Sequence, residues 1–332
     1  MGEELAKPSK AAQTLEMDLP HLFGVDIGGT KTAVIRGNKS GVPEEVVAFE
    51  TGDADTTLKR VFRELDLMVP DHDALIGVAC GDPLDRLKGI IQEPPNLPGW
   101  KDIRIVERLE DHFTCKAYLM NDANAGALAE WRFGAGEKSR NMMFVTAGTG
   151  FGAGMILNGQ LYEGISGSAG EIGHVRLSDQ GPTGYGKVGS VEGFCSGGGI
   201  AQVAQAVAIS KDGEVAFNPG DIGDITAKSL AAAAKKGDRK ALEIFEDVGQ
   251  RYGQALAILI DILNPERIVI GSVFERCRPF LEPSMRRVLK SECLDRSLGV
   301  CEIVPAALGD EIGNYAALAV AQYRAGFWKC ED

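Results

Sequence analysis

The chain has 332 residues, of which 44% are hydrophobic, and a formal net charge of −12. This length allows one or two domains with substantial cores, and the acidic balance without a basic stripe argues against a nucleic-acid-binding surface. The seven cysteines include no Cys-x-x-Cys pair, a usage typical of reduced thiols rather than of a disulfide framework. No run approaches the ~18 apolar residues of a membrane helix, and residues 1–20 lack the apolar segment of a signal peptide. We therefore expect a cytoplasmic protein that binds neither nucleic acid nor membrane. Residues 1–20 are expected to form a flexible tail.

The first half of the chain alternates strands and helices after residue 20. Residues 22–35 are expected to form a hairpin whose strands flank the glycine turn Asp26-Ile-Gly-Gly-Thr-Lys31. The elements expected next are a helix over 56–69, a strand over 74–79, a turn over 81–85, a helix over 103–113, a strand over 116–120 and a helix over 124–133. This order predicts a mixed α/β layer.

The second half repeats that outline from another glycine turn, Thr146-Ala-Gly-Thr-Gly150, which also lies between two strands. A glycine-rich loop over 164–199 follows. After it the pattern predicts helices over 200–208, 227–235 and 239–263, a strand over 267–270, a helix over 283–290, a strand over 301–305 and a last helix over 314–324. The sequence therefore predicts two related α/β domains, with a cleft between them as the natural ligand site.

The two glycine turns indicate an anion site. A strand–glycine turn–strand unit brings bare backbone N–H groups close to an anion because no Cβ is in the way. Two such turns about 120 residues apart suggest a duplicated fold that holds one polyphosphate from two sides. Neither turn has the spacing of a Walker loop or of a dinucleotide-binding fingerprint.

Two acidic residues are candidates for chemistry. Asp26 lies beside the first turn, where a carboxylate near phosphates needs a cation, so it could reach a nucleotide-bound Mg²⁺ through water; alternatively, it only caps the turn. Asp122 follows Asn121 at a strand-to-helix junction among small residues. As a general base, Asp122 could accept the proton of a sugar hydroxyl that attacks a γ-phosphoryl group, with Asn121 orienting the sugar. Helix N-capping explains this pair equally well.

The glycine-rich loop contains Glu171, His174 and Glu192. Two carboxylates and an imidazole supply the acceptors and the mixed donor that the hydroxyls of a sugar require. His174 is one of four histidines and the only one in a polar glycine-rich loop, which favours a functional over a structural role. We interpret the other three histidines as surface residues.

Taken together, these segments resemble the ROK family of sugar kinases, within the actin-like ATPase and hexokinase superfamily. The similarity covers the chain from Leu22 to about Phe327. It rests on the two glycine turns and on further motifs in the same order: Pro95-Asn-Leu-Pro-Gly-Trp100, Asn121-Asp-Ala-Asn124, Ser168-Ala-Gly-Glu-Ile-Gly-His174 and Leu263-Asn-Pro-Glu266 with Val269-Ile-Gly271.

The resemblance implies an α/β fold of two ribonuclease-H-like domains, with mixed β-sheets flanked by helices, that close over ATP and sugar in a homodimer. The smaller domain is expected over 21–123, completed by a C-terminal helix over 313–328, and the larger over 124–312. Asp122 is implied as the catalytic base. The implied sugar ligands are Asn96, Asn121, Asp122, Glu171, His174 and Glu192. The implied nucleotide-binding residues are Asp26 (to Mg²⁺ through water), Gly28, Gly29, Thr30, Lys31, Gly148, Thr149, Gly150 and, near the adenosine, Gly271.

Two departures from the family pattern are visible. Most members have a zinc knuckle of one histidine and three cysteines that begins at the histidine of the Glu-Ile-Gly-His segment. Here His174 remains, but Gly184, Gly186 and Ser190 stand at the cysteine positions. Glycine and serine supply no thiolate, so no zinc site is expected and the loop must be held by turns and packing. The second departure is Ser272, where a further glycine is common.

The activity that the resemblance implies is ATP-dependent phosphorylation of a hexose 6-hydroxyl, with glucose as the leading substrate. An N-acetylhexosamine or N-acetylmannosamine kinase is the alternative, because the same ligands recur there. The family's repressors carry a DNA-binding domain of roughly 60–80 residues before the first glycine turn, whereas about 20 polar residues precede it here. A non-catalytic sugar sensor is a remote alternative, which the presence of Asp26, Asp122 and both glycine turns disfavours.

Overall fold

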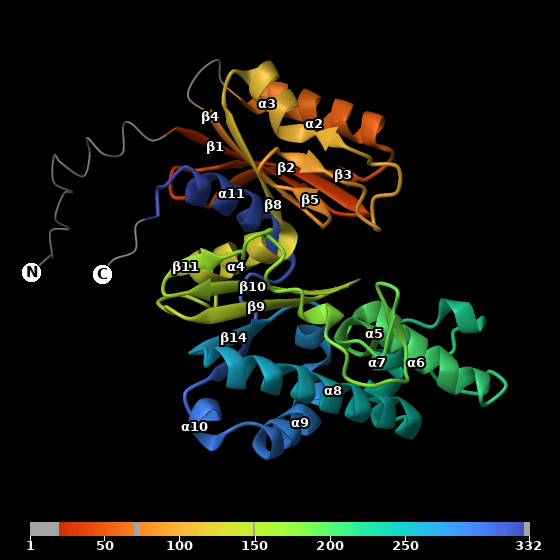
Figure 1. Ribbon diagram of the computed structural model, residues 1–332. Coiled ribbons are helices and arrows are strands. Elements are labelled where there is room, and N and C mark those ends of the chain that lie inside the picture. Colours follow the sequence, from red (N-terminus) through yellow and green to blue (C-terminus); the bar gives the residue numbers. More distant parts are fainter. Residues whose placement is uncertain (1–19, 70–73, 149, 329–332) are drawn as a thin grey trace, which may run out of the picture. The chain divides into compact units, whose positions relative to one another are not determined.

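The computed structural model describes residues 20–69, 74–148 and 150–328 (Figure 1). The chain divides into two compact units, one formed by Met1–Ala125 with Gly313–Asp332 and the other by Gly126–Ile312. The tail predicted over residues 1–20 lies, apart from Pro20, outside the described residues. Each unit is built around one five-stranded mixed sheet.

The sheet of the first unit has the strand order β3-β2-β1-β4-β8. The strands β1, β2 and β3 form an antiparallel meander, and β4 and β8 extend the sheet parallel to β1. Helices α2 and α3 cover one face and α11 the other (Figure 1). The bounds are β1 His21–Ile27, β2 Lys31–Gly37, β3 Pro43–Glu50, α2 Ala54–Met68, β4 Ala74–Cys80, α3 Ile105–Phe113, β8 Lys116–Asn121 and α11 Ile312–Arg324, with a small sheet of β5 Leu84–Asp85, β6 Ile90–Ile91 and β7 Ile103–Arg104.

The sheet of the second unit repeats this arrangement, with the order β11-β10-β9-β14-β15. The strands β9, β10 and β11 again form an antiparallel meander. The strands β14 and β15 again extend the sheet parallel to the first strand of the meander, β9. The bounds are α4 Asp122–Phe133, β9 Met142–Ala147, β10 Phe151–Leu157, β11 Gln160–Tyr162, α5 Val191–Cys195, α6 Gly197–Ile209, α7 Ala227–Lys235, α8 Arg239–Leu263, β14 Arg267–Ile270, α9 Val273–Glu292, α10 Asp295–Leu298 and β15 Glu302–Pro305. Two sheets of one topology confirm the predicted duplication of a ribonuclease-H-like α/β fold.

The predicted glycine-rich loop contains more helix than expected. Ser190 and Ser196 are the N-cap residues of α5 and α6, with side-chain oxygens that accept from the amides of Gly193 and Gly199 at 3.1 and 3.0 Å. Because these caps satisfy amides that a helix start leaves unpaired, helix begins at Val191 and again at Gly197, although glycine disfavours it.

In the first unit, α11 packs closely on two glycines of the sheet. A Cβ at Gly77 of β4 would lie 2.0 Å from the carbonyl oxygen of Ala317, and one at Gly24 of β1 would lie 2.7 Å from the Cβ of Ala317. Ala317 and its neighbours are fully buried. Glycine on the sheet and alanine on the helix therefore set how closely α11 approaches β1 and β4.

This close approach predicts that Gly77→Ala destabilises the protein by about 1–3 kcal/mol or more, because the clashing atoms belong to the backbone of α11 and cannot rotate away. Urea unfolding followed by circular dichroism measures the effect. Gly52→Ala is the matched control, since its nearest atom would lie 3.8 Å away. An equal free energy of unfolding for wild type and Gly77→Ala would contradict this packing.

Among the helices of the described residues, none is both long enough and apolar enough to cross a membrane.

Candidate active site

Three strands of the first sheet end at one edge and bring predicted site residues together. In the parallel register, Asp26 of β1 pairs with Ala79 of β4, and Cys80 of β4 pairs with Asn121 of β8. Ligands of open α/β sheets commonly bind beyond the carboxyl ends of parallel strands. Asp26, Asn121 and Asp122 therefore occupy the edge where a site is expected.

The structure distinguishes the two residues of the pair Asn121-Asp122, because only Asn121 acts as a helix cap. The side-chain Oδ1 of Asn121 accepts a hydrogen bond from the amide of Asn124 at 3.0 Å, so Asn121 caps α4. Asp122 is the first residue of the helix and keeps part of its surface open to solvent. The surrounding protein nevertheless raises the pKa of its carboxyl by desolvation, and hydrogen bonding to the amide of Ala123 counteracts part of that rise. The cap does not depend on Asp122.

The first glycine turn is closed by its own backbone and by Thr51. The amide of Gly28 donates to the carbonyl of Lys31 at 3.0 Å, and the hydroxyl of Thr51 donates to the carbonyl of Gly28 at 2.7 Å. A Cβ at Gly29 would lie 2.6 Å from the carbonyl oxygen of Asn96. The predicted ligands Asn96 and Gly29 are thus in contact, and only glycine fits at this point of the turn.

Asp26 lies between this turn and the start of α11. A Cβ at Gly313 would stand 2.1 Å from the Oδ2 atom of Asp26, so the carboxylate is packed directly against the first turn of the helix. Burial and then repulsion from Asp122 raise the pKa of Asp26 to about 7, although Lys31 lowers it. The sequence did not single out Gly313; a glycine in the first turn of an otherwise alanine-rich helix is the available signal.

The second glycine turn lies in the other unit and is supported from two directions. Gly148 accepts through its carbonyl from the amide of Gly197 at 2.8 Å, where α6 begins. The amide of Phe151 donates to the Oε2 atom of Glu192 at 3.0 Å, and a Cβ at Gly150 would lie 2.9 Å from the same oxygen. Glu192 therefore stabilises the turn through the hydrogen bond to Phe151, and its carboxylate can accept further hydrogen bonds. Thr149 falls outside the described residues.

Gly271 and Ser272 follow β14 beside this turn. The amide of Gly271 donates to the carbonyl of Val145 at 2.9 Å. Ser272 has φ 61° and ψ −121°, a conformation that residues with a side chain rarely adopt, and its hydroxyl lies 3.4 Å from that of Thr146. This backbone conformation explains why a glycine suits position 272.

We expect Ser272→Gly to raise the free energy of unfolding by about 1 kcal/mol, since release of the backbone strain exceeds the entropy cost of glycine. Thermal and urea unfolding measure the change. Ser272→Ala keeps the Cβ and removes only the hydroxyl, so it should show no gain. A Ser272→Gly variant no more stable than Ser272→Ala would refute the strain.

The predicted glycine-rich loop packs on β10 near Glu171. A Cβ at Gly170 would lie 1.9 Å from the carbonyl oxygen of Ala153, and one at Gly173 would lie 2.2 Å from that of Phe151. These contacts place the short 3₁₀ helix η1 (Ile172–His174), and the Glu171 before it, against the strand that leaves the second glycine turn. A Cβ at Gly173 would also be 3.4 Å from that of Glu192.

A hydrogen-bonded hairpin holds the end of this loop. The strands β12 (Thr183–Gly184) and β13 (Lys187–Val188) pair antiparallel, and the Lys187 ammonium donates to the carbonyl of His174 at 2.6 Å. The ring of Tyr185 stands edge-on to that of His174, with centroids 5.1 Å apart. Within residues 20–69, 74–148 and 150–328, no group of three or more His, Cys, Asp or Glu side chains could hold a metal ion.

Two of the residues that we expect at the family's zinc-binding cysteine positions, Gly184 and Ser190, have other uses in this structure. Ser190 is fully buried and caps α5. A Cβ at Gly184 would lie 2.5 Å from the amide nitrogen of Gly193, so that glycine allows the hairpin to pack on α5. Cys195 belongs to the buried core of the second unit.

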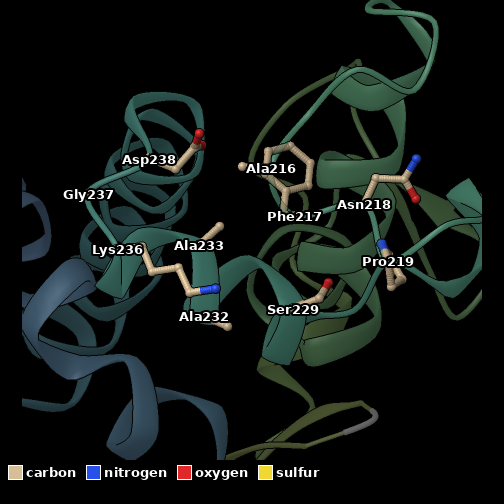
Figure 2. A pocket seen from close by; sticks show the side chains of 10 residues that line it. All are labelled: Ala216, Phe217, Asn218, Pro219, Ser229, Ala232, Ala233, Lys236, Gly237 and Asp238. Carbon is tan, nitrogen blue, oxygen red and sulfur yellow. The ribbon is translucent and has the colours of Figure 1, made fainter.

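A cavity of about 470 Å³ lies away from all of these residues. Figure 2 shows it between the segment 216–219 and helix α7, with Lys236 and Ser229 among its side chains. Ser229 already takes part in the capping box of α7, and Asp238 caps α8. None of the predicted site residues lines this cavity.

Comparison with known proteins decides the family. The family model described as "ROK family" matches residues 22–324. The chain belongs to the ROK family. It is 32% identical to the glucokinase of Halalkalibacterium halodurans over 302 residues, which cover 87% of this chain and 91% of that one.

Two further relatives show the range of the family. The crystal structure of a ROK family glucokinase from Streptomyces griseus, in complex with glucose and AMPPNP, is similar with a TM-score of 0.73 and 26% identity, over 91% of this chain and 99% of that one. The xylose repressor of Caldicellulosiruptor bescii is 28% identical over 265 residues, which cover 77% of this chain and 66% of the repressor.

Proposed function

We propose that this protein is an ATP-dependent glucokinase that transfers the γ-phosphoryl group to the 6-hydroxyl of glucose. The observation that carries the proposal is the position of Asp122. This residue begins α4, and its carboxylate lies near that of Asp26 beside the first glycine turn. Asn121 caps the helix, so the carboxylate of Asp122 is not needed for capping. The similarity to glucokinases over most of the chain supports the substrate.

Asp122 acts in the proposal as general base. It accepts the proton of the 6-hydroxyl as that oxygen forms a bond to the γ-phosphorus, while the bond from this phosphorus to the β,γ-bridging oxygen breaks and ADP leaves. A raised pKa makes the carboxylate a stronger base than an ordinary aspartate. The rest of the rate enhancement comes from positioning and from charge stabilisation.

The nucleotide phosphates are proposed to bind at the two glycine turns, with Thr30, Lys31 and Thr149 contributing beside the glycines. Gly28 and Gly29 carry no Cβ that would keep an anion away from the backbone amides of this turn. ATP enters with Mg²⁺, and the mutually repelling carboxylates of Asp26 and Asp122 fit a divalent cation nearby. Asp26 would hold the hydrated Mg²⁺, which neutralises phosphate charge.

The sugar is proposed to bind to Asn96 and Asn121 of the first unit and to Glu171, His174 and Glu192 of the second. These groups offer the amide, carboxylate and imidazole partners that several hydroxyls need. We further propose that the protein works as a cytoplasmic homodimer, which sedimentation of the purified protein would test.

A panel of sugars tests the substrate. ATP consumption is measured with glucose, mannose, fructose, N-acetylglucosamine and N-acetylmannosamine, each over a range of concentrations. The proposal predicts the highest kcat/KM for glucose. A preference for an N-acetylated sugar would replace glucokinase by an N-acetylhexosamine kinase, and the absence of ATP turnover with every sugar would overturn the kinase assignment.

A further inference from the structure

The turn Gly81-Asp82 follows β4 at the same sheet edge as Asp26 and Asn121. The sequence identifies it only as a turn, and none of the proposed roles uses it. Because β4 lies between β1 and β8, a side chain just beyond Cys80 is placed between those of the two flanking strands. Asp82 therefore stands among the proposed catalytic and sugar-binding groups.

The carboxylate of Asp82 fixes the side-chain amide of Asn121. The Nδ2 group of Asn121 donates to the Oδ2 atom of Asp82, while Oδ1 of Asn121 accepts from the amide of Asn124 at 3.0 Å. An amide held at only one end could turn over and exchange its donor and acceptor. With both ends engaged, the orientation of the Asn121 amide is set.

The same turn also lies close to the other proposed sugar amide, that of Asn96. A Cβ at Gly81 would lie 3.5 and 3.6 Å from the Oδ1 and Nδ2 atoms of Asn96, at van der Waals distance. The turn Gly81-Asp82 thus lies close to Asn96 and is hydrogen-bonded to Asn121.

We propose that Asp82 is a positioning residue for the sugar. Asp82 holds the side-chain amide of Asn121 in one orientation, in which the second N–H of Nδ2 and the second lone pair of Oδ1 of Asn121 face a pair of sugar hydroxyls. The inference rests on the proposed function, because it assigns Asn121 to the sugar. Asp82 acts through a hydrogen bond that it accepts, so its oxygen matters and its charge does not.

Hexose affinity without nucleotide tests this directly. Glucose binding is measured by calorimetry on the full-length wild type and on Asp82→Ala and Asp82→Asn. Loss of one ligand-orienting hydrogen bond should raise the dissociation constant about tenfold in Asp82→Ala. Asp82→Asn keeps an acceptor oxygen and should stay within about threefold of wild type. Asp85→Ala is the matched control, because Asp85 lies in the adjoining strand β5 and its carboxylate accepts from the amide of Lys88 at 3.0 Å.

Kinetics then separate positioning from a structural effect. The Asp82→Ala variant should show a raised KM for glucose, with kcat and the KM for ATP within about threefold of wild type. A merely structural role would lower the active fraction, and with it kcat, and leave KM unchanged. If Asp82→Ala does not fold by circular dichroism, Asp82→Ser replaces it, since its hydroxyl is too short to reach Asn121.

Coupling to Asn121 completes the test. The double variant Asp82→Ala/Asn121→Ala should bind glucose no more weakly than Asn121→Ala alone. Additive losses, or an unchanged dissociation constant in Asp82→Ala, would overturn the inference. If the wild type binds glucose without consuming ATP, the proposed kinase function is refuted, and the glucose affinities of the variants still decide the role of Asp82. If the wild type binds no hexose, both the kinase function and the role of Asp82 are overturned.

Discussion

An Asp122→Asn variant is expected to lose a factor of about 10²–10⁴ in kcat, the usual contribution of a positioned general base. The amide has the shape of the carboxylate but cannot accept the proton of the 6-hydroxyl. Since Asn121 rather than Asp122 caps α4, the fold and the KM for glucose should change little. A coupled ATP assay at saturating glucose measures the loss, and circular dichroism checks the fold.

Asp111→Asn serves as control, because Asp111 is exposed on α3. The pH profile adds a second reading of the base. Because desolvation raises the pKa of Asp122, kcat/KM of the wild type should fall with decreasing pH already above the range of an ordinary aspartate. A kcat within about threefold of wild type in Asp122→Asn would rule out this residue as the base.

An Asp26→Asn variant should lose at least about 100-fold in kcat while becoming more stable than wild type at alkaline pH. Burial and repulsion by Asp122 raise the pKa of Asp26 from 3.8 to about 7 in the folded protein. Between these values the unfolded chain has released a proton that the folded protein still holds. The stability of the wild type therefore falls as pH rises through this window.

The size of the stability effect follows from the raised pKa of Asp26. The contribution of Asp26 should decrease by about 1–2 kcal/mol between about pH 5.5 and about pH 8. Urea unfolding of wild type and Asp26→Asn at both pH values measures it, with Asp111→Asn as control. Mg–ATP should raise the melting temperature of the wild type more than that of the variant. A stability difference independent of pH would contradict the raised pKa.

The duplicated sheets could be predicted because their strands are marked by burial and by glycine turns. β4 is buried along its whole length, and β1 and β9 each lead into a glycine turn. The sequence does not predict the edge strand β3, because Phe49 alone of its eight residues is buried. Such a polar edge strand looks like a loop in sequence.

Helix α9 shows how packing overrides a local signal. The sequence predicts only 283–290, because Pro279 and Pro283 argue against an earlier start. The helix in fact begins at Val273 and contains both prolines. Phe274, Cys277 and Leu281 are buried at helical spacing in the core of the second unit, and their burial outweighs the two missing amide donors.

The candidate site could be named from motifs, but not the contacts that position it. Asp26, Asn121 and Asp122 stand at predicted strand ends, where the local sequence pattern is informative. The bond between Asn121 and Asp82 spans 39 residues, and the packing of Gly313 on Asp26 joins the two ends of the chain. No local pattern encodes such pairs, because they arise only when parallel strands and a distant helix meet.

The most direct test of the central claim is ³¹P nuclear magnetic resonance of the reaction of purified protein with Mg–ATP and glucose. Glucose 6-phosphate and ADP should form in equal amounts, and the Asp122→Asn variant should form them at least about 100-fold more slowly. Release of inorganic phosphate alone, or phosphorylation of glucose at another hydroxyl, would contradict it.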